Sequence, residues 1–401
     1  MNSAIPALLA LLLVSSLVAI PVVAGPGDGV QDRPQAALQE QTVTNETAAE
    51  GTTNRLSLDG EIRSEYVEYG ADFGTLLAST DDELRDDYDQ YTILDRRFDE
   101  VTTDERKQMV QAANENIEDR ADELEEREKN AVQAHASGEM STTELLQILL
   151  RNYHEAAVLS DALDDIEART DRIPGYSLSV KDKQGELDMH RTPVRTSLEM
   201  AARGLEDEIT VAVETSESGY SLTTLDNNYV REVTLDNRKA AWGSEFDDIT
   251  DAYNHASELY PWVFETGSSP TVNEDTSVNL YRITASHDQG RFEAYLDGGT
   301  GNVHREVQEL SHRSIPIETE THWSENGLNV SLSETPRNGP AKITVTDAET
   351  GESESATVTV DGFEIGQTDN DGVLWFVPPS GAYDLVVESD SNSVEITVPE
   401  R

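Results

Sequence analysis

The chain has 401 residues, and its 79 Asp and Glu against 29 Lys and Arg give a formal net charge of −50. A chain this acidic is repelled by phosphate backbones and carries no local basic stripe, so we do not expect it to bind nucleic acid. Cysteine is absent, which excludes disulfides, thiolate metal sites and a cysteine nucleophile.

The basic residues indicate the solvent in which the protein works. Only six of the 29 are lysines and the other 23 are arginines. Few lysines and a large acidic excess suit a protein that stays soluble at molar salt, where screening acts over ~3 Å. We therefore predict a halophilic protein. The alternative, an acidic disordered chain, disagrees with the 36% of hydrophobic residues and their regular spacing.

The amino-terminal segment indicates export. Residues 4–24 carry no charge, and the small residues that end at Ala24 suit a signal peptidase, so we predict that residues 1–24 are a signal peptide cleaved after Ala24. About 20 apolar residues can also span a bilayer, so an uncleaved anchor, the one membrane attachment we would expect, stays open. In either case the protein is expected outside the cell or at its surface.

A polar linker is predicted over residues 25–54, because this stretch has no hydrophobic period and few aromatic residues, as disordered segments do. Asn45 in this linker and Asn329 near the carboxyl end each begin the Asn-x-Ser/Thr pattern of N-glycosylation.

Residues 55–174 are predicted to be helical. Apolar residues recur at three- and four-residue spacing from Leu84 to Phe98, after Thr80 and Glu83, which have the spacing of a capping box. Two longer helices are then expected, and the second begins at Ser141-x-x-Glu144 and ends before Pro174. Joined by only a few residues, they should pair as an antiparallel hairpin of coiled-coil type. Its charged outer face is either solvated or a surface for partner helices.

Residues 175–314 are predicted to be an α+β domain in which a helix packs on an antiparallel sheet. Tyr260, Trp262 and Phe264 form an aromatic cluster after one helix, either as a plug between helix and sheet or as an exposed patch for a partner. The element order and the stretch YLDGGTGNVHRE resemble the PepSY-type modules of exported proteins.

Residues 315–401 alternate apolar and polar side chains in short segments, which predicts an Ig-like or prealbumin-like β-sandwich. Residues 367–385 resemble the carboxypeptidase-regulatory-like or prealbumin-like domains of cell-surface proteins, a resemblance that implies a spacer or adhesive module. Asp369 and Asp371, followed by Gly372, have the oxygen-ligand spacing of a calcium turn, and an ordinary acidic turn is the alternative.

Catalytic motifs are missing from the sequence, which has no spaced histidines for zinc, no nucleophile elbow and no phosphate loop. The stretches 172–178, 258–264 and 294–300 resemble haloarchaeal exported proteins of uncharacterised function, which implies no activity. We therefore expect a multidomain, non-enzymatic cell-surface or secreted protein that binds or spaces other envelope or secreted proteins, with no cofactor beyond the Ca²⁺ considered above. The alternative is an exported regulator or inhibitor of a peptidase that acts through the PepSY-like region.

Overall fold

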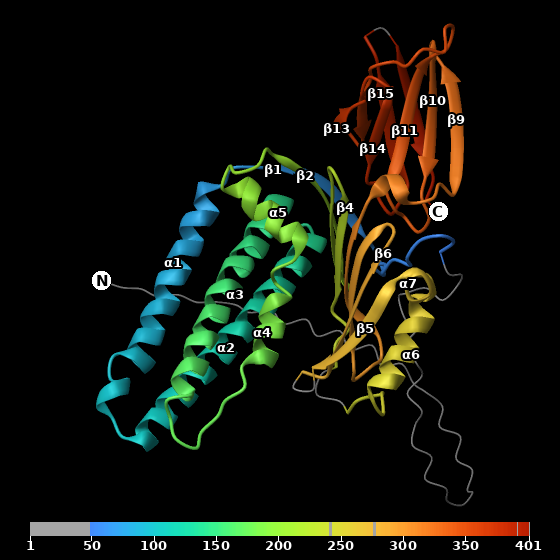
Figure 1. The fold of residues 1–401 in the computed structure, drawn as a ribbon. Coiled ribbons are helices and arrows are strands. Elements are labelled where there is room, and N and C mark those ends of the chain that lie inside the picture. The colour runs from blue at the N-terminus through green and yellow to red at the C-terminus, as the bar shows by residue number, and fades with distance from the viewer. Residues whose placement is uncertain (1–48, 240–242, 276–277, 391, 401) are drawn as a thin grey trace, which may run out of the picture. The chain divides into compact units, whose positions relative to one another are not determined.

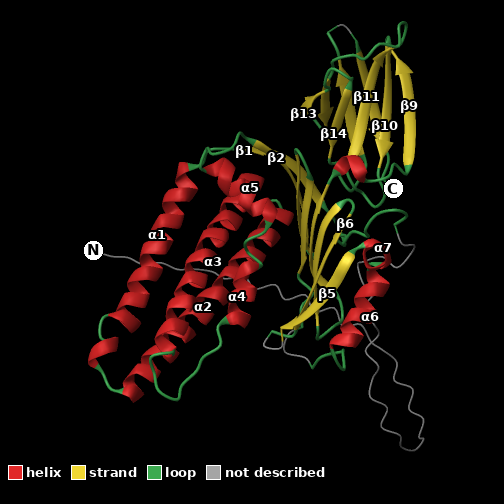
Figure 2. Ribbon diagram, viewed as in Figure 1, coloured by secondary structure: helices red, strands yellow, loops and turns green. Residues whose placement is uncertain are grey.

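The computed structural model describes residues 49–400 except 240–242, 276–277 and 391, and Figure 1 draws the other residues as a grey trace. The expected signal peptide, its cleavage after Ala24 and the glycosylation pattern at Asn45 lie outside the described residues. In the described part, helices are followed by antiparallel sheets, and the carboxyl-terminal region consists of strands (Figure 2).

The helical region is built on three long helices, α1 (Phe73–Gln90), α2 (Thr103–Ala136) and α3 (Thr142–Thr170). A π turn (Tyr91–Asp95) and a 3-10 turn (Phe98–Glu100) follow α1. α2 and α3 lie side by side and share a buried apolar cluster (Figure 1).

The sequence determines where the two longest helices begin. Ser141 and Glu144 form the predicted capping box at the start of α3, and Thr102 with Glu105 forms a second one at the start of α2. In both boxes the hydroxyl accepts from a backbone N–H and the glutamate accepts from the cap backbone, so two donors at the helix end are satisfied.

The predicted start of α1 is wrong. The helix begins at Asp72, whose carboxylate accepts from the backbone N–H of Thr75 at 3.0 Å. Thr80 lies inside the helix and donates its hydroxyl proton to the carbonyl of Leu76 at 2.9 Å. Because Asp72 caps the helix about two turns before Thr80, the spacing of Thr80 and Glu83 does not mark a helix start.

One eight-stranded antiparallel sheet follows the helices, although its first strand precedes them. Its strands in spatial order are β1 (Arg63–Tyr69), β2 (Ile209–Ser216), β3 (Gly219–Leu225), β4 (Tyr229–Leu235), β8 (Val303–Leu310), β7 (Gly290–Asp297), β6 (Leu280–His287) and β5 (Ser268–Asp275). Four shorter helices accompany it: α4 (Lys181–Asp188), α5 (Pro193–Ala202), α6 (Ile249–Leu259) and α7 (Pro261–Thr266). β1 comes from the stretch that the sequence analysis assigned to helices, because its partner β2 is too distant in the chain for local periodicity to reveal the pairing.

The two halves of this sheet are covered by helices on opposite faces. α2, α3 and α5 share an apolar cluster with β2 and β3, whereas α6 and α7 share one with β6, β7 and two residues of β4. Leu222 of the first cluster pairs with Glu232 of β4, so these two side chains lie on the same face of the sheet. The next residue of β4, Val233, points to the opposite face and belongs to the second cluster. The two clusters therefore lie on opposite faces of the sheet. Each half therefore keeps one face without a helix of its own.

The carboxyl-terminal region contains two four-stranded antiparallel sheets. One has the order β14 (Val373–Phe376), β11 (Ala341–Asp347), β10 (Leu328–Glu334) and β9 (Thr319–Glu325). The other has the order β13 (Phe363–Gln367), β12 (Thr357–Val360), β15 (Tyr383–Glu388) and β16 (Ser393–Val398). The alternate apolar residues of both sheets meet in one buried cluster, as the alternation in the sequence predicts.

Two tight hairpins depend on glycine. Gly219 begins β3 with φ +152°, and Gly290 begins β7 with φ +149°. A Cβ at Gly219 would lie 2.0 Å from the carbonyl oxygen of Thr234, and one at Gly290 would lie 2.0 Å from that of Glu309. The neighbouring strand, β4 beside Gly219 and β8 beside Gly290, therefore leaves no room for a side chain at either position.

We expect Gly290→Ala to lower the free energy of unfolding by about 2 kcal/mol or more, because the added Cβ meets the Glu309 carbonyl in a backbone conformation strained for L residues. Chemical denaturation at constant molar KCl measures the change. Gly381→Ala is the matched control, since its Cβ would have no heavy atom within 4 Å. Equal losses in the two variants would contradict the steric argument.

Candidate functional site

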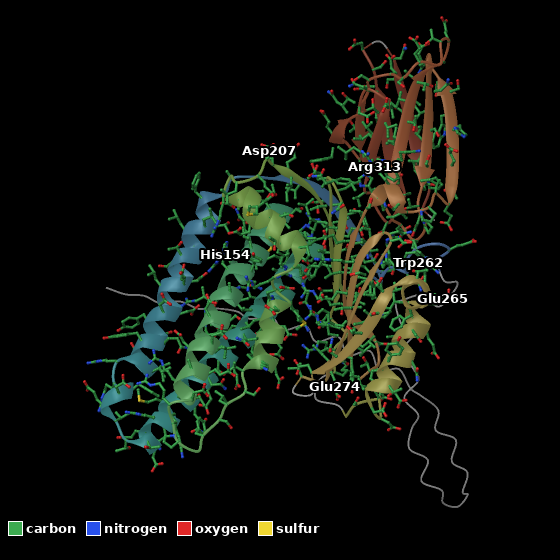
Figure 3. The ribbon with its side chains drawn as sticks, viewed as in Figure 1. His154, Asp207, Trp262, Glu265, Glu274 and Arg313 are labelled. Carbon is green, nitrogen blue, oxygen red and sulfur yellow. The ribbon has the colours of Figure 1, made fainter. Side chains whose placement is uncertain are left out.

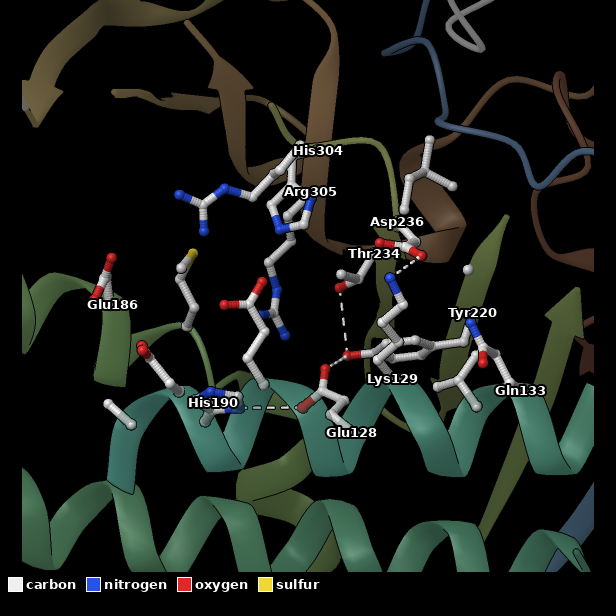
Figure 4. A pocket seen from close by; sticks show the side chains of 18 of the residues that line it. Glu128, Lys129, Gln133, Glu186, His190, Tyr220, Thr234, Asp236, His304 and Arg305 are labelled. Atoms are coloured by element: carbon white, nitrogen blue, oxygen red, sulfur yellow. Dashed lines mark hydrogen bonds and ion pairs between the residues drawn. The ribbon is translucent and has the colours of Figure 1, made fainter. Parts of the chain in front are cut away.

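A cluster of buried charged side chains joins the helices to the sheet, and Figure 4 shows part of it. We call it the buried ionic cluster. Its members are Glu128 from α2, Arg195 from α5, Tyr220 from β3, Glu232 from β4 and Arg305 from β8. None of the five is more than 7% exposed. Charged groups are buried in this way only when they are paired and hydrogen-bonded.

Arg195 is at the centre of this cluster. Its Nη1 and Nη2 each donate to the Glu128 carboxylate at 2.9 Å, which is the bidentate geometry that a guanidinium favours. Nη2 also lies 3.2 Å from Oε1 of Glu232, which accepts a further bond from Arg305. The Tyr220 hydroxyl lies between the two carboxylates, 2.6 Å from Glu128 and 3.0 Å from Glu232.

The charges of the cluster balance, since two carboxylates face two guanidiniums. Burial alone would raise the pKa of Glu128, but the charges of Arg195 and the hydrogen bond from His190 outweigh it and hold this pKa well below its usual value. Burial likewise opposes ionisation of Glu232, and Arg195 and Arg305 together lower its pKa. Both carboxylates are therefore ionised and fully engaged, which suits a structural connection better than proton transfer.

A cavity of about 100 Å³ adjoins the cluster between α2, α4 and β3, β4 and β8 (Figure 4). Lys129 and Asp236 form an ion pair of 2.6 Å in its wall. His304 is 8% exposed, its Nδ1 has no hydrogen-bond partner, and burial with nearby arginines lowers its pKa to about 3. The volume suits a few water molecules and is below the ~300 Å³ at which small-molecule pockets begin.

The buried ionic cluster holds its charged groups in fixed pairs. Its two carboxylates are held by arginines, and His304 in the adjoining cavity is neutral and buried. Among residues 49–400, leaving out the masked positions, no group of three or more His, Asp or Glu side chains could hold a metal ion.

A second layer of ion pairs attaches α1 to α2 and α3. Asp82 accepts from Arg151 at 2.8 Å, and Asp86 lies 3.4 Å from Arg120. Both aspartates are buried, and burial next to Glu155 raises the pKa of Asp86 to about 6. The inner face of α1 is therefore polar and charged.

The outer face of α1 is apolar. Five large side chains share an arc of roughly 60° at 3.6 residues per turn. We call them the α1 stripe: Phe73, Leu77, Leu84 and Tyr88 of α1, and Tyr91, the first residue of the π turn that continues it, which are 73%, 71%, 63%, 66% and 52% exposed. The sequence analysis placed the last three on a helix face with Leu94 and Phe98, but only Leu94 and Phe98 are buried. The amphipathic pattern of α1 is thus reversed, because ion pairs occupy the side that faces the bundle.

The predicted aromatic cluster of Tyr260, Trp262 and Phe264 is buried to different depths. Tyr260 is 0% exposed and donates its hydroxyl proton to Glu306 at 2.8 Å. Trp262, which Figure 3 labels, and Phe264 belong to α7, are half-buried and pack against the same apolar cluster. Tyr260 therefore has no surface to offer a partner, and its packing is that of a plug between α7 and the sheet.

The other predicted site residues lie in the carboxyl-terminal region, and they do not meet the buried ionic cluster. The carboxylate of Asp369 accepts from the backbone N–H of Asp371 at 2.9 Å and of Val373 at 3.0 Å, so it closes a turn of the chain. Asp371 is exposed, and Asn329 is half-buried on β10. The structure thus places Asp369 and Asp371 together in one turn, and Asn329 separately on β10.

Sequence reasoning missed the buried ionic cluster, although a signal was present. Glu128 follows Leu124 by four residues and precedes Ala131 by three, so it lies on the apolar stripe of α2. A charged residue on a buried face requires a partner. The partners Arg195, Glu232 and Arg305 come from distant segments, and local spacing gives no way to choose them among the many charges of this chain.

Glu128→Gln should lower the free energy of unfolding by about 3–5 kcal/mol, because it leaves the buried guanidinium of Arg195 without its bidentate anion. Denaturant titration of Glu128→Gln, Arg195→Met and the double variant measures the coupling, and we expect the double variant to lose less than the sum of the single losses. The control is Lys129→Met. It breaks an ion pair whose side chains are 48% and 46% exposed, so we expect a loss below about 1 kcal/mol. Additive losses in the cycle would refute a shared cluster.

Acid should destabilise the fold from neutral pH downward. The pKa of His304 is lowered to about 3, and those of His135 and His154 to about 4, so the unfolded chain takes up protons first below its pKa of 6.5. The contribution of these histidines to the free energy of unfolding is therefore fully present above pH 6.5 and is lost as the pH falls below it. The raised pKa of Asp86 has the opposite effect, because its contribution to stability is lost as the pH rises.

For His304 alone we expect a loss of roughly 1–2 kcal/mol between pH 7 and pH 5. His304→Gln should flatten this dependence in denaturant titrations at constant molar KCl. His322→Gln, at an exposed position on β9, is the control and should leave the dependence unchanged. Identical pH profiles for His304→Gln and the parent chain would show that His304 does not contribute.

Three family models match successive parts of the chain. Residues 1–207 match the domain of unknown function DUF7096, residues 211–316 match the family of unknown function DUF7094, and residues 319–396 match the archaeal fibronectin-III type-like domain. The match of the third region is therefore to fibronectin type III, and that of the second is to DUF7094, where the sequence analysis expected a PepSY-type module. Searches among curated proteins and among solved structures find no match.

In the described part of the chain, the helices are too short or too polar to cross a membrane. The archaeal domain agrees with the expected resemblance to archaeal proteins of uncharacterised function. Because the first match covers more than half of the 401 residues, the chain belongs to the DUF7096 family.

Proposed function

We propose that the protein is an exported, non-enzymatic binding protein of the envelope of a halophilic archaeon, and that the α1 stripe docks a helix of a partner protein. The antiparallel hairpin of α2 and α3 would hold the stripe in place, and the carboxyl-terminal β-sandwich would act as a spacer. The observation that carries the proposal is the α1 stripe, in which five large side chains of α1 and of the turn that continues it are more than half exposed.

Exposing the stripe to water is unfavourable in free energy, and a partner that covered it would remove this cost. Burial of a large apolar side chain is worth about 1.5–3 kcal/mol, so a stripe of five such residues can support a stable contact. Leu77, Leu84 and Tyr91 are spaced by seven residues, and Phe73 and Tyr88 lie four residues from a neighbour in the stripe. This is the spacing with which one helix packs along another.

The charges beside the stripe favour a particular kind of helix. The exposed charged residues that border it are Asp81, Glu83, Arg85 and Asp87, three acids and one base. A second copy of α1 would bring acids against acids. We therefore propose a partner helix with an apolar stripe bordered by Arg or Lys, as complementary charges at the edges of a helix pair select partners.

A designed helical peptide with leucines at heptad spacing and arginine borders tests this proposal. We expect it to bind the full chain at molar KCl, measured by fluorescence anisotropy, and we expect the same peptide with glutamate borders to bind at least tenfold more weakly. Leu84→Gln should weaken binding of the arginine peptide by about tenfold or more, because it removes roughly 1.5–3 kcal/mol of apolar contact. Its own stability should change by no more than about 0.5 kcal/mol, because the side chain is 63% exposed.

The matched control is Ile317→Gln, which alters a 42% exposed aliphatic side chain in the segment between β8 and β9. The proposed partner would be refuted if Leu84→Gln left the affinity for the arginine peptide unchanged. It would also be refuted if the arginine and glutamate peptides bound with equal affinity. A concentration-dependent dimer that Leu84→Gln abolishes would instead identify a second copy as the occupant.

A further inference from the structure

A groove of about 610 Å³ lies on the face of β5, β6, β7 and β8 that no helix of that half covers. One wall is the segment Asp188–Pro193 with Tyr153 of α3, and the floor is the polar face of the four strands. The groove forms because α6 and α7 cover the other side of this half-sheet, while α4 contacts α3 and α2. Its volume falls within the ~300–1,000 Å³ of small-molecule sites.

The groove holds an unusual share of arginine for so acidic a chain. Four arginines line it, against the three carboxylates of Asp188, Glu293 and Glu309. The four are Arg191, Arg282, Arg291 and Arg305. In the whole chain acids outnumber bases by 79 to 29, so an ordinary solvated surface of this protein would be acidic. With Arg305 paired to Glu232, the remaining lining has three arginines against three carboxylates, so the groove lacks the acidic excess that repels anions elsewhere on the chain.

The arginines are not equally available. Arg305 belongs to the buried ionic cluster, and Arg282 forms two bonds of 3.0 Å with Glu293. Arg191 and Arg291 are exposed on opposite sides, one on the α4–α5 connection over the ring of Tyr153 and the other on β7. Two guanidiniums can thus meet a ligand across the groove, and each suits a carboxylate.

Hydroxyl-bearing side chains also line the groove. They include those of Thr196, Ser268, Ser269, Thr271, Thr284 and Ser286. Thr271 and Thr284 lie side by side on neighbouring strands, with 2.8 Å between their oxygens. A surface of this kind can exchange hydrogen bonds with a ligand that itself carries many hydroxyls, as donor and acceptor.

We infer that this groove binds a carboxylate-bearing oligosaccharide. Arg191 and Arg291 hold carboxylates of the ligand, and the Ser and Thr hydroxyls of β5 and β6 contact its sugar hydroxyls. An acidic peptide would satisfy the arginines, but its backbone would leave this row of hydroxyls with fewer partners. The site is independent of the α1 stripe and does not rest on the proposed docking of a helix.

Calorimetric titration of the full chain with trigalacturonate at molar KCl tests the inference. We expect binding of the free acid and a loss of at least tenfold for the same oligomer with methyl-esterified carboxylates, because the charge-assisted bonds to arginine are lost. Arg291→Gln should weaken binding about tenfold or more. Arg313→Gln, labelled in Figure 3 at an exposed position that does not line the groove, should not change it.

Several results would overturn the inference. They are the absence of trigalacturonate binding, equal binding of the acid and its ester, and identical affinities for Arg291→Gln and Arg313→Gln. Binding of hexaglutamate that is tighter than that of trigalacturonate would assign the groove to acidic peptides. Leu84→Gln should leave the affinity for trigalacturonate unchanged, so the proposals for the groove and for the α1 stripe can be refuted independently.

Discussion

The contact between Arg195 and Glu128 is the constraint on which the arrangement of the helices and the sheet depends. Apolar packing alone would allow a helix layer to slide over a sheet, because dispersion and burial have little directional preference. A bidentate ion pair fixes both position and orientation, and here it extends through Tyr220 and Glu232 to Arg305, across β3, β4 and β8. The cluster is neutral as a whole, so it is tolerated in the interior, and each member is needed to compensate another.

The opposite coverage of the two half-sheets explains where surfaces for binding remain. The helices α2 and α5, which carry Glu128 and Arg195, share their apolar cluster with β2 and β3. α6 and α7 share theirs with β6 and β7, on the opposite face of the sheet. The arginine-lined groove is the face left open by this change of side. The α1 stripe arises differently, because α1 uses its polar residues for the bundle and turns its apolar residues outward. One surface is thus a result of topology and the other of a reversed amphipathic helix.

Local patterns in the sequence predicted the elements that depend on local interactions. The bounds of α2 and α3 follow from their capping residues and apolar spacing, and the strands of the carboxyl-terminal region follow from alternation. The failures concern partners that are distant in the chain. The pairing of β1 with β2, the partners of Glu128 and the outward direction of Leu84 all depend on which surfaces meet. In a chain with 79 acids, spacing cannot show which carboxylate is buried with an arginine.

The way in which α1 is attached has a consequence for its dynamics. The apolar clusters of the described structure take none of their residues from 73–90, so this helix is held to its neighbours by ion pairs and hydrogen bonds. Its detachment would leave the interior of the α2–α3 pair closed. Such an element can open as a separate cooperative unit, with a free energy well below that of global unfolding. The bundle can therefore exchange α1 between a bound and a released state while the rest of the protein stays folded.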